Sequence, residues 1–173
     1  MRDDVDYTQF IKKLQLPPGH TVPTELTYED LLIRAITRAD LDDDVRGINA
    51  SMELIRRTRG GRWPTEPVTA EGNFVDLVWH ELEFRDATSF TYVVRHGDGG
   101  YVGCAYLYPL GRRGPLSEAL LAYDVDVSWW VTPDAHERGY YHKLYRALRH
   151  WLADIFPFEA PFYSNAELPS ESP

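Results

Sequence analysis

The stretch from Ala122 to Ile155 places a strand, a short loop and a helix in a row, an arrangement that can bind a phosphate group. In residues 122–132, polar side chains alternate with valines at period two, as in a β-strand, and Pro133 ends the pattern. After Gly139 the apolar residues recur at helical spacing. A helix that begins at such a loop directs unpaired backbone N–H groups and the positive end of its dipole toward one point. The sequence therefore predicts an anion site around Gly139.

Two carboxylates on the predicted strand could do acid–base chemistry. Asp124 and Asp126 are two residues apart, so their side chains share one face of the strand. A carboxylate can act as a general base when burial or a like-charged neighbour raises its pKa. The alternative is that both are ordinary solvent-facing partners of Val125 and Val127, since alternation alone explains them. Asp126 is the first candidate for a base.

His80 and Glu81 form a second candidate group on a predicted helix. Glu81 falls on or beside the apolar face of that helix, where a carboxylate is unexpected. The second histidine of a zinc-protease motif is missing, so no metal site is predicted. Glu81 could hold a cationic substrate or assist Asp126. The alternative is an ion pair with Arg85 at the helix edge, four residues along the chain.

The strand and the loop carry two short motifs. They are Trp130-Val131-Thr132-Pro133 and His136-Glu137-Arg138-Gly139-Tyr140-Tyr141. Together they resemble the acyl-CoA-binding segment of the GNAT superfamily of N-acyltransferases, in which an apolar-x-Pro step is followed by Gln/Arg-x-x-Gly-x-Gly/Ala. Gly139 matches the first glycine of that pattern, whereas His136 and Tyr141 depart from it. The resemblance covers about residues 32–166.

The resemblance implies acetyl-CoA as co-substrate and transfer of its acetyl group to the amine of a small molecule. In the family, the strand backbone holds the pantetheine arm and the amides at the helix start hold the pyrophosphate, which the Arg138 cation would also attract. The coenzyme-binding residues that this implies are Trp130, Val131, Thr132, His136, Arg138, Gly139, Tyr140, Tyr141 and Asn165.

The resemblance also suggests catalytic residues. Asp126 aligns with an acidic residue that many family members carry on this strand, which supports it as the base. Glu81 and Tyr141 are the further catalytic candidates, Tyr141 as an acid. The alternative function is a non-catalytic acyl-CoA-binding or dimerising protein on the same fold, which the departures at His136 and Tyr141 favour.

The elements that must position these residues follow from periodicity and turn signals. A strand is predicted at 32–36, one or two helices from a capping-box-like start at Thr37 to Ile55, and a helix from Thr69 to Phe84. Two strands at 89–95 and 101–108 flank a glycine-rich hairpin, and a last strand is predicted near 161–164. In the helix predicted from Thr69 to Phe84, the residues expected to face inward are Phe74, Leu77, Val78 and Leu82.

This order indicates an α/β (α+β) domain of GNAT-like type, with a central, mostly antiparallel twisted sheet and helices on both faces. Its C-terminal part is shortened relative to the family. Residues 1–30 are expected to form an N-terminal extension and residues 31–173 the acyltransferase-like domain. The extension would lie as a strap on the domain surface; the alternative is a lid or the arm of a homodimer.

Composition excludes several classes of protein. The net charge of −9 argues against a nucleic-acid-binding surface, which is usually basic. No apolar run approaches the length of a membrane span, and the first residues do not resemble a signal peptide. Cys104 is the only cysteine, so no internal disulfide can form. We expect a cytoplasmic protein with a small-molecule partner.

Overall fold

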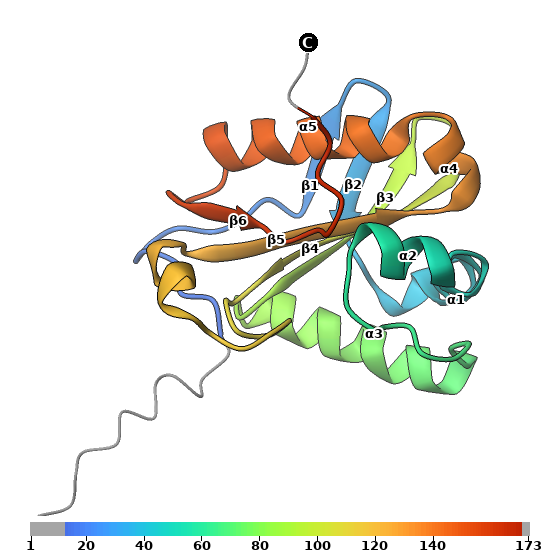
Figure 1. Cartoon of the computed structure of the whole chain (residues 1–173), viewed down its shortest axis with the longest axis horizontal. Coiled ribbons are helices and arrows are strands. Elements are labelled where there is room, and N and C mark those ends of the chain that lie inside the picture. Colours follow the sequence, from blue (N-terminus) through green and yellow to red (C-terminus); the bar gives the residue numbers. More distant parts are fainter. Residues whose placement is uncertain (1–12, 171–173) are drawn as a thin grey trace, which may run out of the picture.

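The computed structural model describes residues 13–170, which build one six-stranded sheet with helices on both faces (Figure 1). The strands lie side by side in chain order; every neighbouring pair is antiparallel except the last, β5 and β6, which is parallel. The elements are β1 (Glu25–Tyr28), β2 (Leu31–Ala35), α1 (Leu41–Ala50), α2 (Met52–Thr58), α3 (Ala70–Arg85), β3 (Phe90–His96), β4 (Tyr101–Tyr108), β5 (Val125–Val131), α4 (Pro133–Glu137), α5 (Tyr140–Asp154) and β6 (Pro161–Tyr163), with 3-10 turns at Arg38–Asp40 and Glu118–Ala122. The predicted α/β class with a mostly antiparallel sheet is confirmed.

The two faces of the sheet are covered by different helices, as Figure 1 shows. Helix α5 lies on one face, and α1, α2 and α3 lie on the other. The capping box predicted at Thr37 is present, with Asp40 as its acidic partner, and Thr69 caps α3 by accepting from the N–H of Gly72. None of the helices in residues 13–170 has the length and apolarity that a bilayer span requires.

Strand β5 is buried on both faces, which contradicts the solvent-facing reading of its polar residues. All seven of its residues are buried. Val125, Val127, Trp129 and Val131 pack in the core under α5, whereas Trp130 belongs to the core under α1–α3. By alternation Asp126 and Ser128 face the α1–α3 side as well. A period-two pattern indicates that the two faces of a strand have different environments. Here the polar residues Asp126 and Ser128 are buried under α1–α3 and do not face water.

The predicted start of this strand, at 122, is wrong. Residues 118–122 form a 3-10 turn, and β5 begins at Val125. Asp124 precedes the strand, and its carboxylate accepts the backbone N–H groups of Glu159 and Ala160 at 2.7 and 3.1 Å. Asp124 therefore anchors the chain that leads to β6 and has no shared face with Asp126.

Two other predictions need correction. The inward face of α3 holds Leu77 and Asn73, whereas Phe74 is 40% exposed, so the predicted apolar face was rotated. Residues assigned to an N-terminal extension include β1, which pairs with β2, and Leu14, which is buried in the core. Residues 1–12 of the extension lie outside the described part of the chain.

The last two strands, β5 and β6, diverge, and the gap between them is part of the candidate site. Strand β6 pairs with β5 only from Val125 to Val127. After Tyr163 the chain leaves the sheet (red in Figure 1) and runs beside the end of α2, where the N–H groups of Ala166 and Glu167 donate to the carbonyls of Arg59 and Thr58. We call residues 164–170 the C-terminal segment.

Candidate functional site

The start of α5 has the geometry of an anion site. Gly139 precedes the helix with a left-handed backbone (φ 83°), and no side chain caps the helix there. A Cβ atom added to Gly139 would meet no other atom within 4 Å, so the space in front of the helix is open. The first-turn amides of a helix have no acceptor within the helix and point into such a space. Arg138, beside them, is half exposed. This part of the predicted coenzyme site fits a pyrophosphate.

Fewer backbone groups of β5 are free to bind a coenzyme than the sequence predicted. Alternate residues of a strand direct their backbone groups to opposite neighbours. The N–H of Thr132 donates to Val102 O at 2.8 Å, so Thr132 and, two residues earlier, Trp130 face β4. Val131 is the residue of the predicted trio whose backbone faces the edge where β6 has left.

The gap between β5 and β6 is filled by two side chains that the sequence predicted to bind the coenzyme. Asn165 is buried; its Oδ1 accepts from the N–H of Trp129 at 3.1 Å, and its Nδ2 donates to Trp129 O at 2.9 Å. The Tyr141 hydroxyl accepts from Asn165 Nδ2 at 2.8 Å and donates to Glu167 O at 2.6 Å. In this structure the pair holds the C-terminal segment against β5, where a pantetheine arm is expected.

Tyr141 is not placed to act as a general acid in this arrangement. Its ring lies between Trp129 and His136, at centroid distances of 5.3 and 5.5 Å. Burial raises the pKa of Tyr141 to about 12, and its hydroxyl is committed to the C-terminal segment. Tyr140, also predicted to bind coenzyme, donates through its hydroxyl to Asp30.

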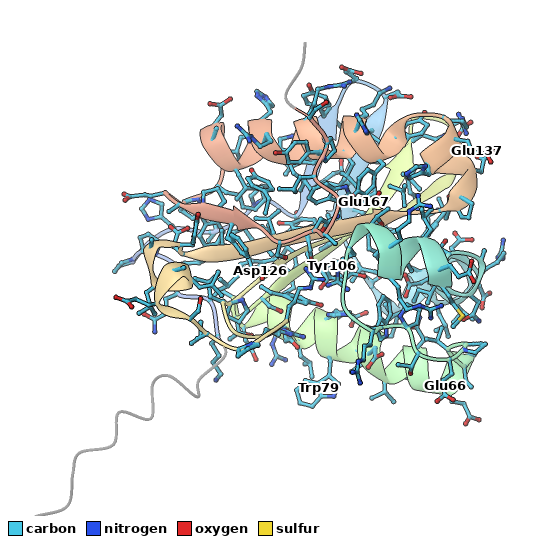
Figure 2. The ribbon with its side chains drawn as sticks, viewed as in Figure 1. Glu66, Trp79, Tyr106, Asp126, Glu137 and Glu167 are labelled. Carbon is cyan, nitrogen blue, oxygen red and sulfur yellow. The ribbon has the colours of Figure 1, made fainter. Side chains whose placement is uncertain are left out.

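A cavity of about 580 Å³ lies on the face of the sheet opposite to α5, between β4, α3 and the loop after α2. Figure 2 shows Tyr106 on the sheet and Trp79 on α3, two of its lining residues. We call it the arginine cavity, because Arg59, Arg62, Arg112 and Arg113 all line it. The other lining residues are Gly60, Gly61, Trp63, Asp76, Trp79, His80, Glu83, Tyr106 and Tyr108.

His80, and not Glu81, faces this cavity. The Nδ1 atom of His80 lies 3.0 Å from Thr91 Oγ1, which fixes the ring. Burial lowers the pKa of His80 to about 4, so the imidazole is neutral at pH 7 and is a weak base. Neighbouring helical residues are rotated by about 100° from one another, which turns Glu81 away from the cavity.

Glu81 is bound elsewhere, and the predicted ion pair with Arg85 is absent. The carboxylate of Glu81 accepts from Arg38 Nε and Nη2, at 3.1 and 2.6 Å, and from the Arg38 N–H at 2.6 Å. Arg85 pairs with Asp86 instead. Glu81 thus ties α3 to the turn before α1, and the structure does not bring it to Asp126 or to the cavity.

Asp126 is buried behind the cavity wall. Its Oδ1 accepts from Ser164 Oγ at 2.5 Å, and Ser164 in turn accepts from Arg113 Nη1 at 2.5 Å. Burial raises the pKa of Asp126, and the charges of Arg113 and Arg59 oppose that rise. Asp126 is not among the lining residues; Arg113 is. The carboxylate therefore acts on the cavity through Ser164 and Arg113.

Sequence reasoning missed the residues that give the cavity its charge. Arg59 follows α2, and Arg112 and Arg113 stand in the loop before β5. Arg59 is more than 50 residues away from the other two arginines in the chain, and no periodicity connects it with them. The signal that could have been used is the Arg112-Arg113 pair in a chain of net charge −9.

The low pKa of His80 predicts a pH-dependent stability. In the unfolded chain a histidine titrates near 6.5, whereas in the fold the pKa is about 4. Between these two pKa values the unfolded state binds more protons than the folded state. The contribution of neutral His80 to the free energy of unfolding is therefore fully present above pH 6.5 and is lost as the pH falls toward 4. From pH 7 to pH 5 the free energy of unfolding should fall by about 2 kcal/mol through this residue.

The measurement is urea unfolding of the native protein and of His80→Gln at both pH values. Other groups titrate in both proteins, so the difference between the two isolates His80. The glutamine variant should lose about 2 kcal/mol less than the native protein over this range. An equal loss in both would mean that His80 titrates normally in the fold.

Comparison with known proteins agrees with this architecture. A family model described as the acetyltransferase (GNAT) domain matches residues 30–166. A search of curated protein sequences gives no match. The similar solved structures include a ribosomal L7/L12 alpha-N-protein acetyltransferase (RimL) in complex with coenzyme A, at 10% identity and a TM-score of 0.54, covering 76% of this chain and 67% of that one.

Two further structures show the same likeness. One is a ribosomal-protein-S5-alanine acetyltransferase from Vibrio fischeri, at 12% identity and a TM-score of 0.55, with 75% of this chain and 67% of that chain covered. The other is a spermidine N-acetyltransferase from Vibrio cholerae in complex with CoA and spermine, at 16% identity and a TM-score of 0.50, with 73% and 66% covered. At these identities the likeness to the structures shows the fold alone.

Proposed function

This chain belongs to the GNAT acetyltransferase family, whose members use acetyl-CoA as co-substrate, and we propose that it acetylates the amine of a small molecule held in the arginine cavity. The observation that carries the proposal is that the cavity wall and the open start of α5 are both connected to strand β5. Arg59, from the cavity wall, donates through Nε to Ser128 Oγ on β5 at 3.1 Å. The loop at Gly139 follows the same strand.

The size of the cavity supports a small acceptor. A volume of about 580 Å³ is in the range of pockets that enclose small ligands. Aromatic rings on β4, Tyr106 and Tyr108, give it an apolar floor, and Trp63 and Trp79 stand at its exposed side. Such walls exclude water from the reacting groups and orient a flat molecule.

The chemistry assigns a role to few residues. The amine must be neutral to attack. An imidazole with a pKa of about 4 is too weak a base to deprotonate an ammonium, so we assign to the neutral His80 on the cavity wall the role of a hydrogen-bond acceptor that orients the amine. The amine nitrogen forms a bond to the thioester carbonyl carbon, the carbon–sulfur bond breaks, and the thiolate takes up the proton that the nitrogen loses. We assign to Asp126 the positioning of Arg113 through Ser164, and to the amides of residues 140–142, with Arg138, the binding of the pyrophosphate.

The first test is binding and transfer by the full chain. Calorimetric titration with acetyl-CoA, with acetate and ATP as controls, should show binding in the micromolar range. Release of free CoA thiol in the presence of a panel of small amines, with the N-acetyl product identified by mass, should follow. Binding without any product would favour the non-catalytic acyl-CoA-binding alternative, and absence of binding would overturn the proposal.

Tyr141 is expected to limit coenzyme affinity, because its ring and hydroxyl fill the gap between β5 and β6. Tyr141→Ala should tighten acetyl-CoA binding about tenfold, since the competent open form no longer has to be reached against these contacts. The same change should lower the free energy of unfolding by about 3 kcal/mol through the lost packing. Calorimetry and urea unfolding measure the two effects.

The matched control is Tyr145→Ala. Tyr145 stacks on the same Trp129 ring, at a centroid distance of 5.2 Å, but makes no bond to Asn165. It should destabilise the fold similarly without tightening the binding of acetyl-CoA. Weaker binding by Tyr141→Ala than by the native protein would mean that the ring supports the coenzyme site and does not obstruct it.

A further inference from the structure

The arginine cavity carries an excess of positive charge that the rest of the protein does not have. Its lining residues include four arginines and two carboxylates, Asp76 and Glu83, and His80 is neutral there. The whole chain has a net charge of −9. Positive charge gathered in one concave site of an acidic protein creates a local field that attracts anions.

Only one of these arginines is neutralised by a carboxylate of the cavity wall. Arg112 forms an ion pair with Glu83, and its guanidinium lies 3.9 Å from the centre of the Tyr108 ring. Arg113 donates to the carbonyls of Arg59 and Gly60 and to Ser164, which separates it from Asp126. Burial and the neighbouring charge of Arg59 lower the pKa of Arg113 to about 10.

Arg59 has unused donors that point to a ligand. Arg59 is 8% exposed, and its guanidinium lies 4.0 Å from the centre of the Tyr106 ring. Within residues 13–170, Ser128 Oγ is the acceptor that this guanidinium finds, through Nε. The two terminal nitrogens, which could bind a carboxylate or a phosphate by two parallel hydrogen bonds, have no protein acceptor in that part of the chain. In the described residues the enclosed side-chain polar atom without a partner is Trp129 Nε1, so the terminal nitrogens of Arg59 are not sealed in protein and can reach a ligand in the cavity.

We propose that the amine acceptor carries an anionic oxygen group, a carboxylate or a phosphate, which Arg59 and Arg62 bind inside the arginine cavity. This inference rests on the proposed function for the place of the acceptor, and it names the class of that acceptor. The aromatic floor under Arg59 adds a preference for a flat or apolar body between the anionic group and the amine. Polyamines, which are cationic along their length, are poor acceptors by the same argument.

The binding test uses acetylated products, so that it does not depend on turnover. N-acetylphenylalanine is compared with N-acetylphenethylamine, which lacks only the carboxylate, by calorimetry on the full chain without acetyl-CoA. The charged member should bind about tenfold more tightly or better, as expected for a charge-assisted pair. A second comparison, of N-acetyl-O-phosphoethanolamine with N-acetyl-β-alanine in the same titration, distinguishes a phosphate from a carboxylate as the preferred group.

The variants are Arg59→Gln and Arg62→Gln, with Arg46→Gln as the control. Arg62 is exposed at the cavity rim, so its variant should fold even if the buried Arg59 is needed for stability. Arg46 is an exposed arginine of α1 outside this cavity. The first two changes should each remove about tenfold of the affinity for the charged product, and the control should change nothing.

The outcomes separate this inference from the proposed function. Equal or tighter binding of the uncharged product in the native protein overturns the inference, even where acetyl transfer to neutral amines proceeds. Preferential binding of the charged product without any acetyl transfer supports the inference for the cavity and removes the proposed function. Preferential binding that survives both arginine variants overturns the assignment to Arg59 and Arg62.

Discussion

Replacing Gly139 by tryptophan is expected to weaken acetyl-CoA binding about 100-fold or more while the domain stays folded. The indole would stand in the open space before α5, where the first-turn amides must reach the pyrophosphate. Apart from residue 139 and its two chain neighbours, no described atom lies within 4 Å of the new Cβ, so the change does not disturb the core. Calorimetric titration with acetyl-CoA measures the affinity, and circular dichroism confirms the fold.

The control for this variant is Gly99→Trp. Gly99 has the same left-handed backbone (φ 91°) and equally open surroundings, but it stands in the β3–β4 hairpin. Both variants therefore pay about the same backbone strain of 1 to 2 kcal/mol, and only one stands at the predicted site. Retained coenzyme binding in Gly139→Trp, or an equal loss in Gly99→Trp, would remove the helix-start loop from the coenzyme site.

His80→Gln is expected to lower kcat about 100-fold with little change in the KM for acetyl-CoA, since it replaces the imidazole that orients the amine on the cavity wall. Glutamine keeps a polar group beside Thr91, so the contact at Nδ1 can be replaced. Steady-state kinetics with the best acceptor of the amine panel gives both constants. Because the imidazole is already neutral above pH 6, the native rate should show no His80 titration between pH 6 and pH 8.

Asp126→Asn is the companion variant, because Asp126 is the base that the sequence suggested. Asparagine keeps an oxygen that can accept from Ser164 but removes the charge that steadies Arg113. We expect kcat to change little, because Asp126 lies behind the cavity wall and reaches it only through Ser164 and Arg113. A large loss of kcat in Asp126→Asn, together with a nearly native rate in His80→Gln, would instead make Asp126 the catalytic base, as the sequence suggested.

The sequence predicted most of the fold because the relevant signals are local. The hairpin around residues 97–100 and the helix start at Thr69 are set by turn and capping chemistry within a few residues. The strand, loop and helix around Gly139 were predicted for the same reason, and the resemblance to the GNAT family rested on them. The short helix α4 and strand β1 were missed. Helix α4 begins at Pro133, which was interpreted only as the end of the strand, and β1 directly follows a stretch that contains Pro17, Pro18 and Pro23.

The candidate site was predicted only in part, because its geometry depends on contacts between distant segments. Period-two alternation placed Asp126 on the correct face of its strand but could not show that α2 and the C-terminal segment bury that face. The choice between His80 and Glu81 required the rotation of α3 about its axis, which an error of one residue reverses. The departure of Tyr141 from the family pattern is visible in the sequence, but its bond to Asn165 forms only when the chain after β6 folds back.

The sequence by itself determined the order of the elements, the glycine at the start of α5 and the departure at Tyr141, since each depends on residues adjacent in the chain. Only the tertiary structure decided that Arg59, Arg62, Arg112 and Arg113 line one cavity and that His80 faces it. The physical reason is that charge in a cleft is a sum over side chains from separate loops, and the positions of those loops are fixed by packing of the helices on the sheet.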